Sequence, residues 1–173
     1  PGIYGAFRFA SGKAIFFAYC TMICLAGFAL FDLRDTHGAL WMLWLALVVI
    51  ATDVFGYFGG RLIGGPKFWP RVSPKKTWSG TAAGWVAAAI VGVLFAAFTN
   101  AGVGLVVVSV LMSFASQMGD IAESAIKRRA EVKDSSALIP GHGGLLDRFD
   151  GMLGASVALL LLQLIIDSPV PAL

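Results

Sequence analysis

Three acidic residues in the second half of the chain stand among basic residues, in a pattern that suits phosphate chemistry. Asp147 and Asp150 are three residues apart, so on a helix they share a face, and Arg148 lies between them. Asp120 is a third carboxylate that could converge with them. Mg²⁺ binds carboxylate oxygens and keeps positions for water and phosphate, while Lys and Arg neutralise the remaining phosphate charge. Two or three of these carboxylates therefore predict a Mg²⁺–phosphate site.

A glycine-rich turn, Pro140-Gly141-His142-Gly143-Gly144, comes shortly before Asp147. Such a turn exposes backbone N–H groups that can bind an anion. His142 could contact a phosphate or only cap the turn. The two glycines after it and the carboxylate five residues on favour the functional role.

A second basic segment, residues 59–80, reads GGRLIGGPKFWPRVSPKKTWSG. Its prolines and glycines exclude a long helix. Within it, Ser73-Pro74-Lys75-Lys76-Thr77 combines two ammonium groups with two hydroxyls, and we predict a turn there. The combination suits a polyphosphate, although a patch that binds the lipid surface would look similar.

Other catalytic patterns have little support in this sequence. The spacing GxxxxGK[ST] of a Walker A loop is absent, and so is any Cys/His spacing typical of zinc sites. A Ser/His/Asp triad is conceivable on composition, but no G-x-S-x-G motif supports it.

The elements that must position these residues are membrane-spanning helices. Apolar residues make up 58% of the chain and charged residues 13%, with a mean hydropathy of +0.81; soluble domains have about 25% charged residues. Helices of about 20 apolar residues cross a bilayer, whereas open sheets do not. We expect five such helices, over residues 13–31, 39–58, 81–98, 102–118 and 152–166.

The predicted fold is therefore an all-α polytopic membrane bundle with about five transmembrane helices and two long cytoplasmic loops. We expect residues 1–173 to form a single integral-membrane catalytic domain. Because the chain opens with Pro1 rather than Met, we also expect a fragment or processed form that lacks further N-terminal helices.

The distribution of positive charge predicts the orientation of the bundle. The N-terminal stretch, the second loop and the fourth loop hold twelve of the thirteen Lys and Arg residues. With five spans these three segments share one side, and the positive-inside rule places them in the cytoplasm. The charges could also serve only topology and anionic lipid binding, but that leaves the acidic, Gly and His residues among them unexplained.

Polar residues also occur within the predicted spans, close to the two basic loops. Asp53, Gly56, Tyr57 and Gly60 fall on one helix face, and with Arg61 they suggest a charged pocket at the membrane edge, although the glycines could serve helix packing alone. A second set of polar residues lies on one continuous face of a helix that we expect to extend to about residue 129: Ser113, Gln117, Asp120, Ser124 and Lys127. A carboxylate on such a face suggests a functional site, and contacts between helices are the structural alternative.

Two motifs together resemble the phosphatidate cytidylyltransferases, also called CDP-diacylglycerol synthases. The first is Ser124-x-x-Lys127-Arg128-x₄-Lys133-Asp134-x₅-Pro140-Gly141-His142-Gly143-Gly144-x₂-Asp147-Arg148-x-Asp150. The second is Asp53, then Tyr57-Phe58-x-Gly60-Arg61, then Ser73-Pro74-Lys75-Lys76-Thr77-x-x-Gly80. The resemblance covers residues 53–166; Ser79 departs from the acidic residue of many members, and members are usually longer at the N-terminus.

The resemblance implies transfer of a cytidylyl group from CTP to phosphatidate, giving CDP-diacylglycerol and diphosphate, with Mg²⁺ and room for a second cation. The metal ligands it implies are Asp120, Asp147 and Asp150. The catalytic residues would be Lys127, Arg128, Lys133, Asp134, His142 and Arg148. The substrate-binding residues would be Asp53, Tyr57, Arg61, Ser73, Lys75, Lys76, Thr77, Ser124, Gly143 and Gly144.

The phosphatidate phosphate would attack the α-phosphorus of CTP without a general base, because a phosphate monoester is already largely dianionic at neutral pH. We expect CTP, phosphatidate and membrane lipids as partners, no nucleic acid, and a bacterial inner membrane as the location; a homodimer stays open. Two alternatives remain: an ion-coupled transporter, and a related CTP-dependent cytidylyltransferase acting on another lipid phosphate.

Overall fold

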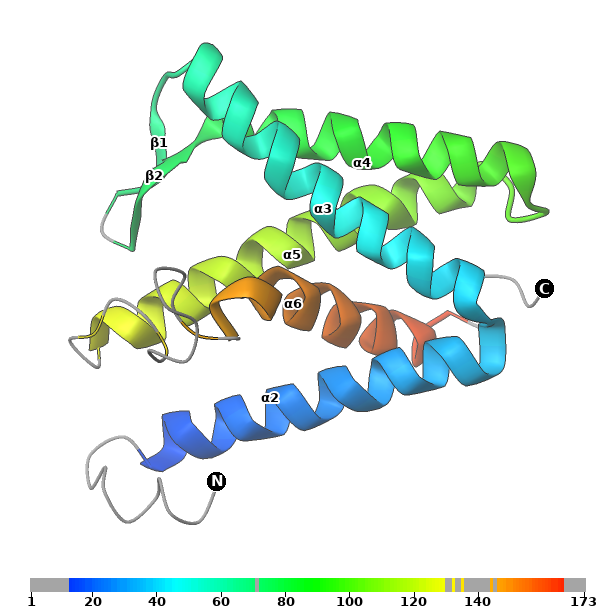
Figure 1. Ribbon diagram of the computed structural model, residues 1–173, viewed down its shortest axis with the longest axis horizontal. Helices are drawn as coiled ribbons and strands as arrows, with labels where there is room; N and C mark the ends of the chain where they lie inside the picture. The colour runs from blue at the N-terminus through cyan, green and yellow to red at the C-terminus, as the bar shows by residue number, and fades with distance from the viewer. Residues whose placement is uncertain are drawn as a thin grey trace.

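The protein is a bundle of long helices with a small hairpin at one end (Figure 1). The computed structural model describes residues 13–70, 72–129, 132, 135, 144 and 146–166. Its α-helices are α2 (Lys13–Asp32), α3 (Ala39–Leu62), α4 (Trp78–Phe98), α5 (Gly104–Arg129) and α6 (Leu146–Gln163). The short π-helix η1 (Leu33–His37) joins α2 to α3 through Gly38, which has a φ of 94°.

The five predicted helices are all present, and the prediction of an all-α membrane bundle is confirmed. Four of the described helices are long and apolar enough to cross a membrane: Phe16–His37, Ala39–Leu62, Trp78–Phe98 and Gly104–Arg129. The polar stripe does carry α5 to Arg129. The fifth helix, α6, has 18 residues and three charged side chains near its start, so its apolar part is shorter than that of the others.

The predicted turn at Ser73–Thr77 is wrong, because this segment is the strand β2 (Ser73–Thr77). It pairs antiparallel with β1 (Lys67–Trp69), with Lys67 opposite Thr77. Pro74 has no N–H to donate and restricts the residue before it to extended backbone, so it suits a strand at a sheet edge. The chain reverses between the strands instead, where Val72 N–H donates to Trp69 O at 3.2 Å.

The polar face of α5 points into the bundle, as predicted. Ser109 accepts a hydrogen bond from Trp44 Nε1 of α3 at 3.0 Å, and Thr52 of α3 donates to Ser113 at 2.7 Å. Around these contacts the buried apolar core includes Leu45, Val48, Leu105, Met112 and Leu159. Polar groups surrounded by hydrocarbon need internal partners, so these hydrogen bonds determine which face of α5 meets α3.

Glycines allow two helix pairs to approach closely. A Cβ added to Gly80 of α4 would lie 2.5 Å from the carbonyl oxygen of Gly56 in α3. On α5, a Cβ added to Gly119 would lie 2.5 Å from Asp150 O and 3.0 Å from the Cα of Gly154, both in α6. These contacts bring the backbones of α3 and α4, and of α5 and α6, together at the end of the bundle that carries the hairpin.

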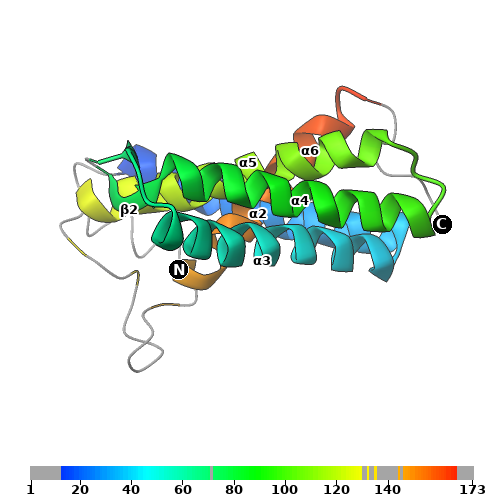
Figure 2. The same cartoon turned by 90° about the horizontal axis from the view of Figure 1, so that it is seen from above.

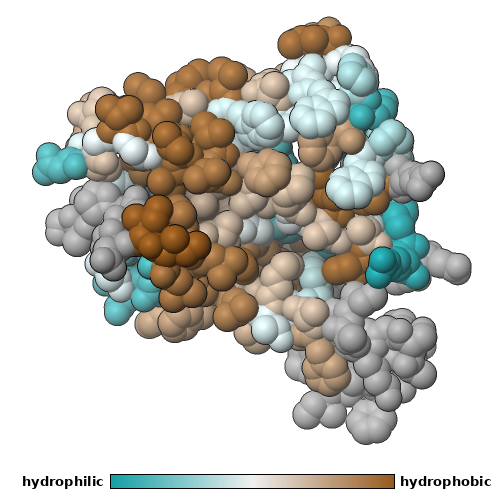
Figure 3. All heavy atoms as spheres, turned by 180° about the vertical axis from the view of Figure 1, so that it is seen from behind, coloured by the Kyte–Doolittle hydropathy of each residue, from teal (hydrophilic) through white to brown (hydrophobic). Residues whose placement is uncertain are grey.

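The charged segments gather at one end of the bundle. The hairpin, the start of α2, the end of α5 and the start of α6 lie together, whereas the α2–α3 and α4–α5 junctions lie at the other end (Figures 1 and 2). Apolar side chains cover the middle of the face in Figure 3, with hydrophilic side chains toward its ends. The second and fourth loops therefore share an end, as the charge distribution predicted.

We expect Gly154→Val to destabilise the bundle. Its Cβ would lie 2.5 Å from Ala115 O and 2.9 Å from Gly119 Cα, so α5 and α6 must separate. Overpacking of this kind costs about 1–3 kcal/mol, measurable as a lower unfolding temperature in detergent. Gly27→Val in α2 is the matched control, since a Cβ there meets nothing within 4 Å. Equal losses in both variants would contradict the close approach.

Candidate functional site

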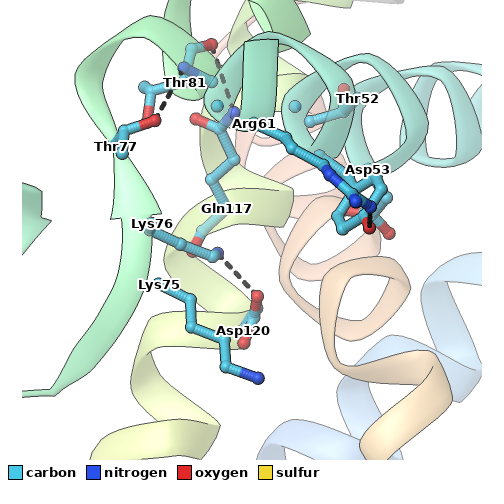
Figure 4. Close-up of a pocket in the computed structure, with 13 residues that line it drawn as sticks. Thr52, Asp53, Arg61, Lys75, Lys76, Thr77, Thr81, Gln117 and Asp120 are labelled. Atoms are coloured by element: carbon cyan, nitrogen blue, oxygen red, sulfur yellow. Dashed lines mark hydrogen bonds and ion pairs between the residues drawn. The ribbon is translucent and has the colours of Figure 1, made fainter. Parts of the chain in front are cut away.

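A cavity of about 410 Å³ with several charged lining residues opens at the hairpin end of the bundle, between α3, β2, α4 and α5 (Figure 4). It contains both signs of charge. Its charged lining residues are Asp53, Arg61, Lys75, Lys76 and Asp120. The remaining lining residues are small or polar: Thr52, Gly56, Tyr57, Gly60, Thr77, Gly80, Thr81 and Gln117. The cavity thus joins the motif that runs from Asp53 to Gly80 to the predicted metal ligand Asp120 of α5.

An ion pair between Lys76 and Asp120 crosses the cavity from β2 to α5. Lys76 Nζ lies 2.6 Å from Asp120 Oδ2 and donates to the carbonyl oxygen of Gln117 at 3.3 Å. Ser124, one turn further along α5, donates to Asp120 Oδ1 at 3.2 Å. The hairpin lysine therefore meets the carboxylate predicted to bind metal.

Gln117 takes the interhelical role that was the structural alternative for the polar stripe of α5. Its side chain is buried, accepts a hydrogen bond from Trp85 Nε1 at 3.1 Å and donates to Thr81 O at 3.3 Å. A Cβ on Gly84 would lie 2.8 Å from Gln117 Nε2, so α4 leaves room for this amide. Gln117 thereby fixes α5 against α4 directly before Asp120.

Thr77 lines the cavity, but its hydroxyl has a structural partner. The Thr77 Oγ1 atom accepts the Gly80 N–H at 3.2 Å and so caps the start of α4. The neighbouring Ser79 donates to the carbonyl oxygen of Gly64. The predicted substrate-binding hydroxyl thus positions the lysines that precede it by fixing where β2 ends and α4 begins.

The α3 wall of the cavity carries the predicted Asp53, Tyr57 and Arg61 face. Arg61 donates to the Tyr57 hydroxyl at 2.7 Å, and its guanidinium lies 5.9 Å from the centre of that ring. In Figure 4, Asp53 and Arg61 lie across the cavity from Lys76. The predicted charged pocket is therefore present, with Asp53 facing the Lys76–Asp120 pair.

A second charged cluster joins the end of α5 to the start of α6. Lys127 Nζ lies 2.6 Å from Asp147 Oδ1 and 3.1 Å from Glu123 Oε2. Asp147 also accepts the N–H groups of Ser135, at 2.9 Å, and Gly144, at 2.7 Å. Asp147 therefore links Ser135 and Gly144 of the fourth loop to the start of α6.

The surroundings shift the pKa values of Asp147 and Asp150, the two carboxyls near the start of α6, in opposite directions. Burial alone would raise the pKa of Asp147, but the hydrogen bonds from Lys127, Ser135 and Gly144 together hold it well below its usual range. The pKa of Asp150 is raised, first by burial and then by the charge of Asp120. The environment thus separates two carboxyls that are only three residues apart.

Glu123 is a site residue that sequence reasoning missed. Its side chain is buried, Oε2 accepts from Lys127, and Oε1 has no hydrogen-bond partner among the described residues. It also interacts with Asp150 and with the Tyr19 hydroxyl of α2. Its position three residues after Asp120 and four before Lys127 was the available signal, since those spacings share a helix face.

The predicted site residues fall into two clusters linked by Asp120. Asp120 pairs with Lys76 in the cavity and interacts with Asp150 of α6. Ser73 begins β2 and does not line the cavity, while Arg128 and Arg148 are exposed. Four predicted residues lie outside the described part of the chain: Lys133, Asp134, His142 and Gly143.

The carboxylates have the chemistry of a cation site but not its compact geometry. Among the described residues, no three His, Cys, Asp or Glu side chains form a group arranged to hold a metal ion. Asp120, Glu123 and Asp150 nevertheless interact, and the buried Glu123 Oε1 has no donor there. Hard cations such as Mg²⁺ prefer carboxylate oxygens, so the chemistry of these side chains, but not their spacing, suits such an ion.

A bundle with four helices able to span a membrane and a charged cavity at one end defines an integral membrane protein. The profile of the family described as "Cytidylyltransferase family" matches residues 4–165, and the chain belongs to this family.

Three relatives carry the name phosphatidate cytidylyltransferase. The protein of Brucella abortus biovar 1 (strain 9-941) is 44% identical over 151 residues, which cover 83% of this chain and 56% of the relative. The one from Staphylococcus saprophyticus is 38% identical over 142 residues (79% and 55%). The one from Bacillus subtilis (strain 168) is 38% identical over 122 residues (69% and 45%). The chain thus spans about half the length of the curated relatives it matches.

We expect Asp147→Asn to destabilise the α5–α6 cluster by about 1–3 kcal/mol at pH 7, because a neutral amide no longer compensates Lys127. A carboxyl with a lowered folded pKa stabilises above its unfolded pKa of about 3.9 and loses this effect as the pH falls toward the folded value. The difference from wild type should therefore shrink below about pH 4.

Unfolding temperatures measured between pH 3 and pH 7 test this prediction. Asp35→Asn, at an exposed position in η1, is the control and should change stability by less than about 0.5 kcal/mol. A loss in Asp147→Asn that is independent of pH would show that Asp147 does not act through its charge.

Proposed function

We propose that this protein transfers a cytidylyl group from CTP to phosphatidate, giving CDP-diacylglycerol and diphosphate in phospholipid biosynthesis. The observation that carries the proposal is the cavity at the end of a membrane bundle where Lys75, Lys76 and Arg61 stand beside Asp120. Its family and the names of its relatives support the same reaction.

The reaction brings together two polyanions that repel each other, and the basic residues of the cavity would offset this repulsion. A phosphate oxygen of phosphatidate forms a bond to the α-phosphorus of CTP, and the bond between the α- and β-phosphates breaks. The attacking phosphate needs no base, since its second pKa is about 6. Lys75, Lys76 and Arg61 would bind phosphate oxygens and offset their charge.

Mg²⁺ is proposed as the cofactor. When bound, it would neutralise phosphate charge and favour departure of diphosphate. Asp120 and Asp150 would hold it, with Glu123 beside them. Asp147 would join this set by giving up one of its donors, since its oxygens already accept hydrogen bonds from Lys127, Ser135 and Gly144.

The lipid substrate would reach the cavity from the side of the bundle. Arg61 lies near the end of α3, and the neighbouring apolar residues Phe58, Leu62 and Ile63 are exposed, with Leu62 at 80%. Exposed apolar side chains on a membrane helix face lipid, so a phosphate head could meet Arg61 while the tails stay in the bilayer. By the positive-inside rule this end would be cytoplasmic, in a bacterial inner membrane.

Diphosphate release tests the reaction directly. The full-length protein, purified in detergent micelles with Mg²⁺ and CTP, should release diphosphate only when phosphatidate is added. A panel of other lipid phosphates would reveal a related cytidylyltransferase with a different substrate. Uptake of an ion-coupled solute into liposomes without any diphosphate release would refute the proposal and favour a transporter.

We expect Asp120→Asn to lower kcat/KM by about 100-fold or more, because the amide neither offsets Lys76 nor binds a hard cation well. Steady-state diphosphate release measures the effect. Asp35→Asn in η1, at the other end of the bundle, should leave kcat/KM within about twofold of wild type. Chelation with EDTA should abolish turnover, and added Mg²⁺ should restore it.

Asp147→Asn provides a separate test of the proposed metal ligands. Full activity in this variant, at a temperature where it remains folded, would exclude Asp147 from metal binding and leave it a structural role in the fourth loop. Loss of activity together with an increased Mg²⁺ requirement would support the ligand role.

A further inference from the structure

Lys76 and Asp120 form an ion pair in the structure. In the proposed reaction, however, Lys76 binds phosphate and Asp120 binds a metal ion. Resting on the proposed function, we propose that Lys76 is the resident counter-ion of Asp120. When a phosphate group binds, it draws the Lys76 ammonium away and opens Asp120 to a divalent cation. Anion and cation then bind cooperatively, each raising the affinity of the site for the other.

The contacts of Asp120 show why the two cations compete. Lys76 Nζ lies 2.6 Å from Oδ2, while Oδ1 accepts the Ser124 hydroxyl at 3.2 Å. A divalent ion bound at Oδ2 would lie almost in contact with the ammonium, and two cations at that distance repel strongly. Lys76 therefore has to move before Oδ2 of Asp120 can serve as a metal ligand.

The charge of the surrounding cavity makes the exchange reciprocal. Asp53 lies on the facing wall and interacts through its charge with both Asp120 and Lys76, so one ammonium offsets part of the charge of two carboxylates. Once Lys76 turns to a phosphate, the two carboxylates lose that positive charge. A divalent cation restores the balance, and this is the physical source of the coupling.

The position of Lys76 makes the exchange feasible. The side chains of the pair are 24% and 33% exposed, so water partly screens the ion pair and a dianionic phosphate can reach and compete for the lysine. Lys76 has a flexible four-carbon stem and projects from a two-stranded hairpin, so it can move without a change in the helices. Lys75, the next residue on β2, also lines the cavity and can bind the same anion.

Mn²⁺ binding without nucleotide tests the proposal independently of turnover. Free Mn²⁺ is counted by electron paramagnetic resonance over the full-length protein in detergent. Lys76→Met should raise the Mn²⁺ affinity at least about fivefold, the low end of ordinary linkage. Lys67→Met removes the same charge from the same hairpin outside the cavity and should change the affinity less than about twofold. An unchanged affinity in Lys76→Met, or an equal rise in both variants, would overturn the proposal.

Two further measurements test the proposal in case the Lys76→Met variant does not fold. Lys76→Gln removes the same charge and keeps a donor for the carbonyl of Gln117, so it should also tighten Mn²⁺ binding. In wild type, sulfate serves as a tetrahedral anion that chelates Mn²⁺ only weakly, and it should raise the Mn²⁺ affinity of the site. Sulfate without effect on wild type would contradict the exchange.

A double-mutant cycle identifies the partner of Lys76. On an Asp120→Asn background the Lys76→Met change should no longer tighten Mn²⁺ binding, since the carboxylate being released is gone. A persistent gain there would assign the effect to general charge and overturn the proposal.

The linkage and the proposed function can fail separately. If cytidylyl transfer is observed but Mn²⁺ binding does not respond to Lys76, the linkage fails and the enzyme assignment stands. If sulfate and Mn²⁺ bind cooperatively but no diphosphate is released, the linkage stands and the proposed reaction fails.

Discussion

The polar face of α5 is the constraint on which the rest of the structure depends. A helix in lipid has no water to satisfy its side chains, so the polar residues of this stripe need hydrogen-bond partners within the protein. Ser113 meets α3, Gln117 meets α4, Asp120 meets the hairpin and Lys127 meets α6. One helix face therefore decides the arrangement of all its neighbours.

The same face places the two motifs next to one another. Gln117 joins α5 to α4 through Trp85, and Thr77 caps α4 at the point where β2 ends. These two contacts position the hairpin lysines next to Asp120. One turn further along α5, Lys127 holds the start of α6 through Asp147. The arrangement of the described site residues thus depends on hydrogen bonds within and at the edge of the membrane region.

Much of this arrangement followed from sequence pattern. Apolar block length predicted five helices, and the 4-3-4-3 spacing from Ser113 to Lys127 predicted both the inward face of α5 and its extension to Arg129. The β-hairpin was missed, because strands of three and five residues are too short for a periodic signal and Pro74 is uncommon within strands. Glu123 was missed because a glutamate beside Lys127 is common on exposed helix faces, and only packing buries it.

By itself, the sequence determined which segments are helices, which loops share an end and which residue types are available for phosphate chemistry. These properties depend on local spacing, hydrophobic length and charge, which a chain carries before it folds. Only the tertiary structure decided that Lys76 pairs with Asp120 while Lys127 pairs with Asp147. Ion pairs between distant segments depend on helix crossings that glycines such as Gly119 allow, and no local pattern encodes those distances.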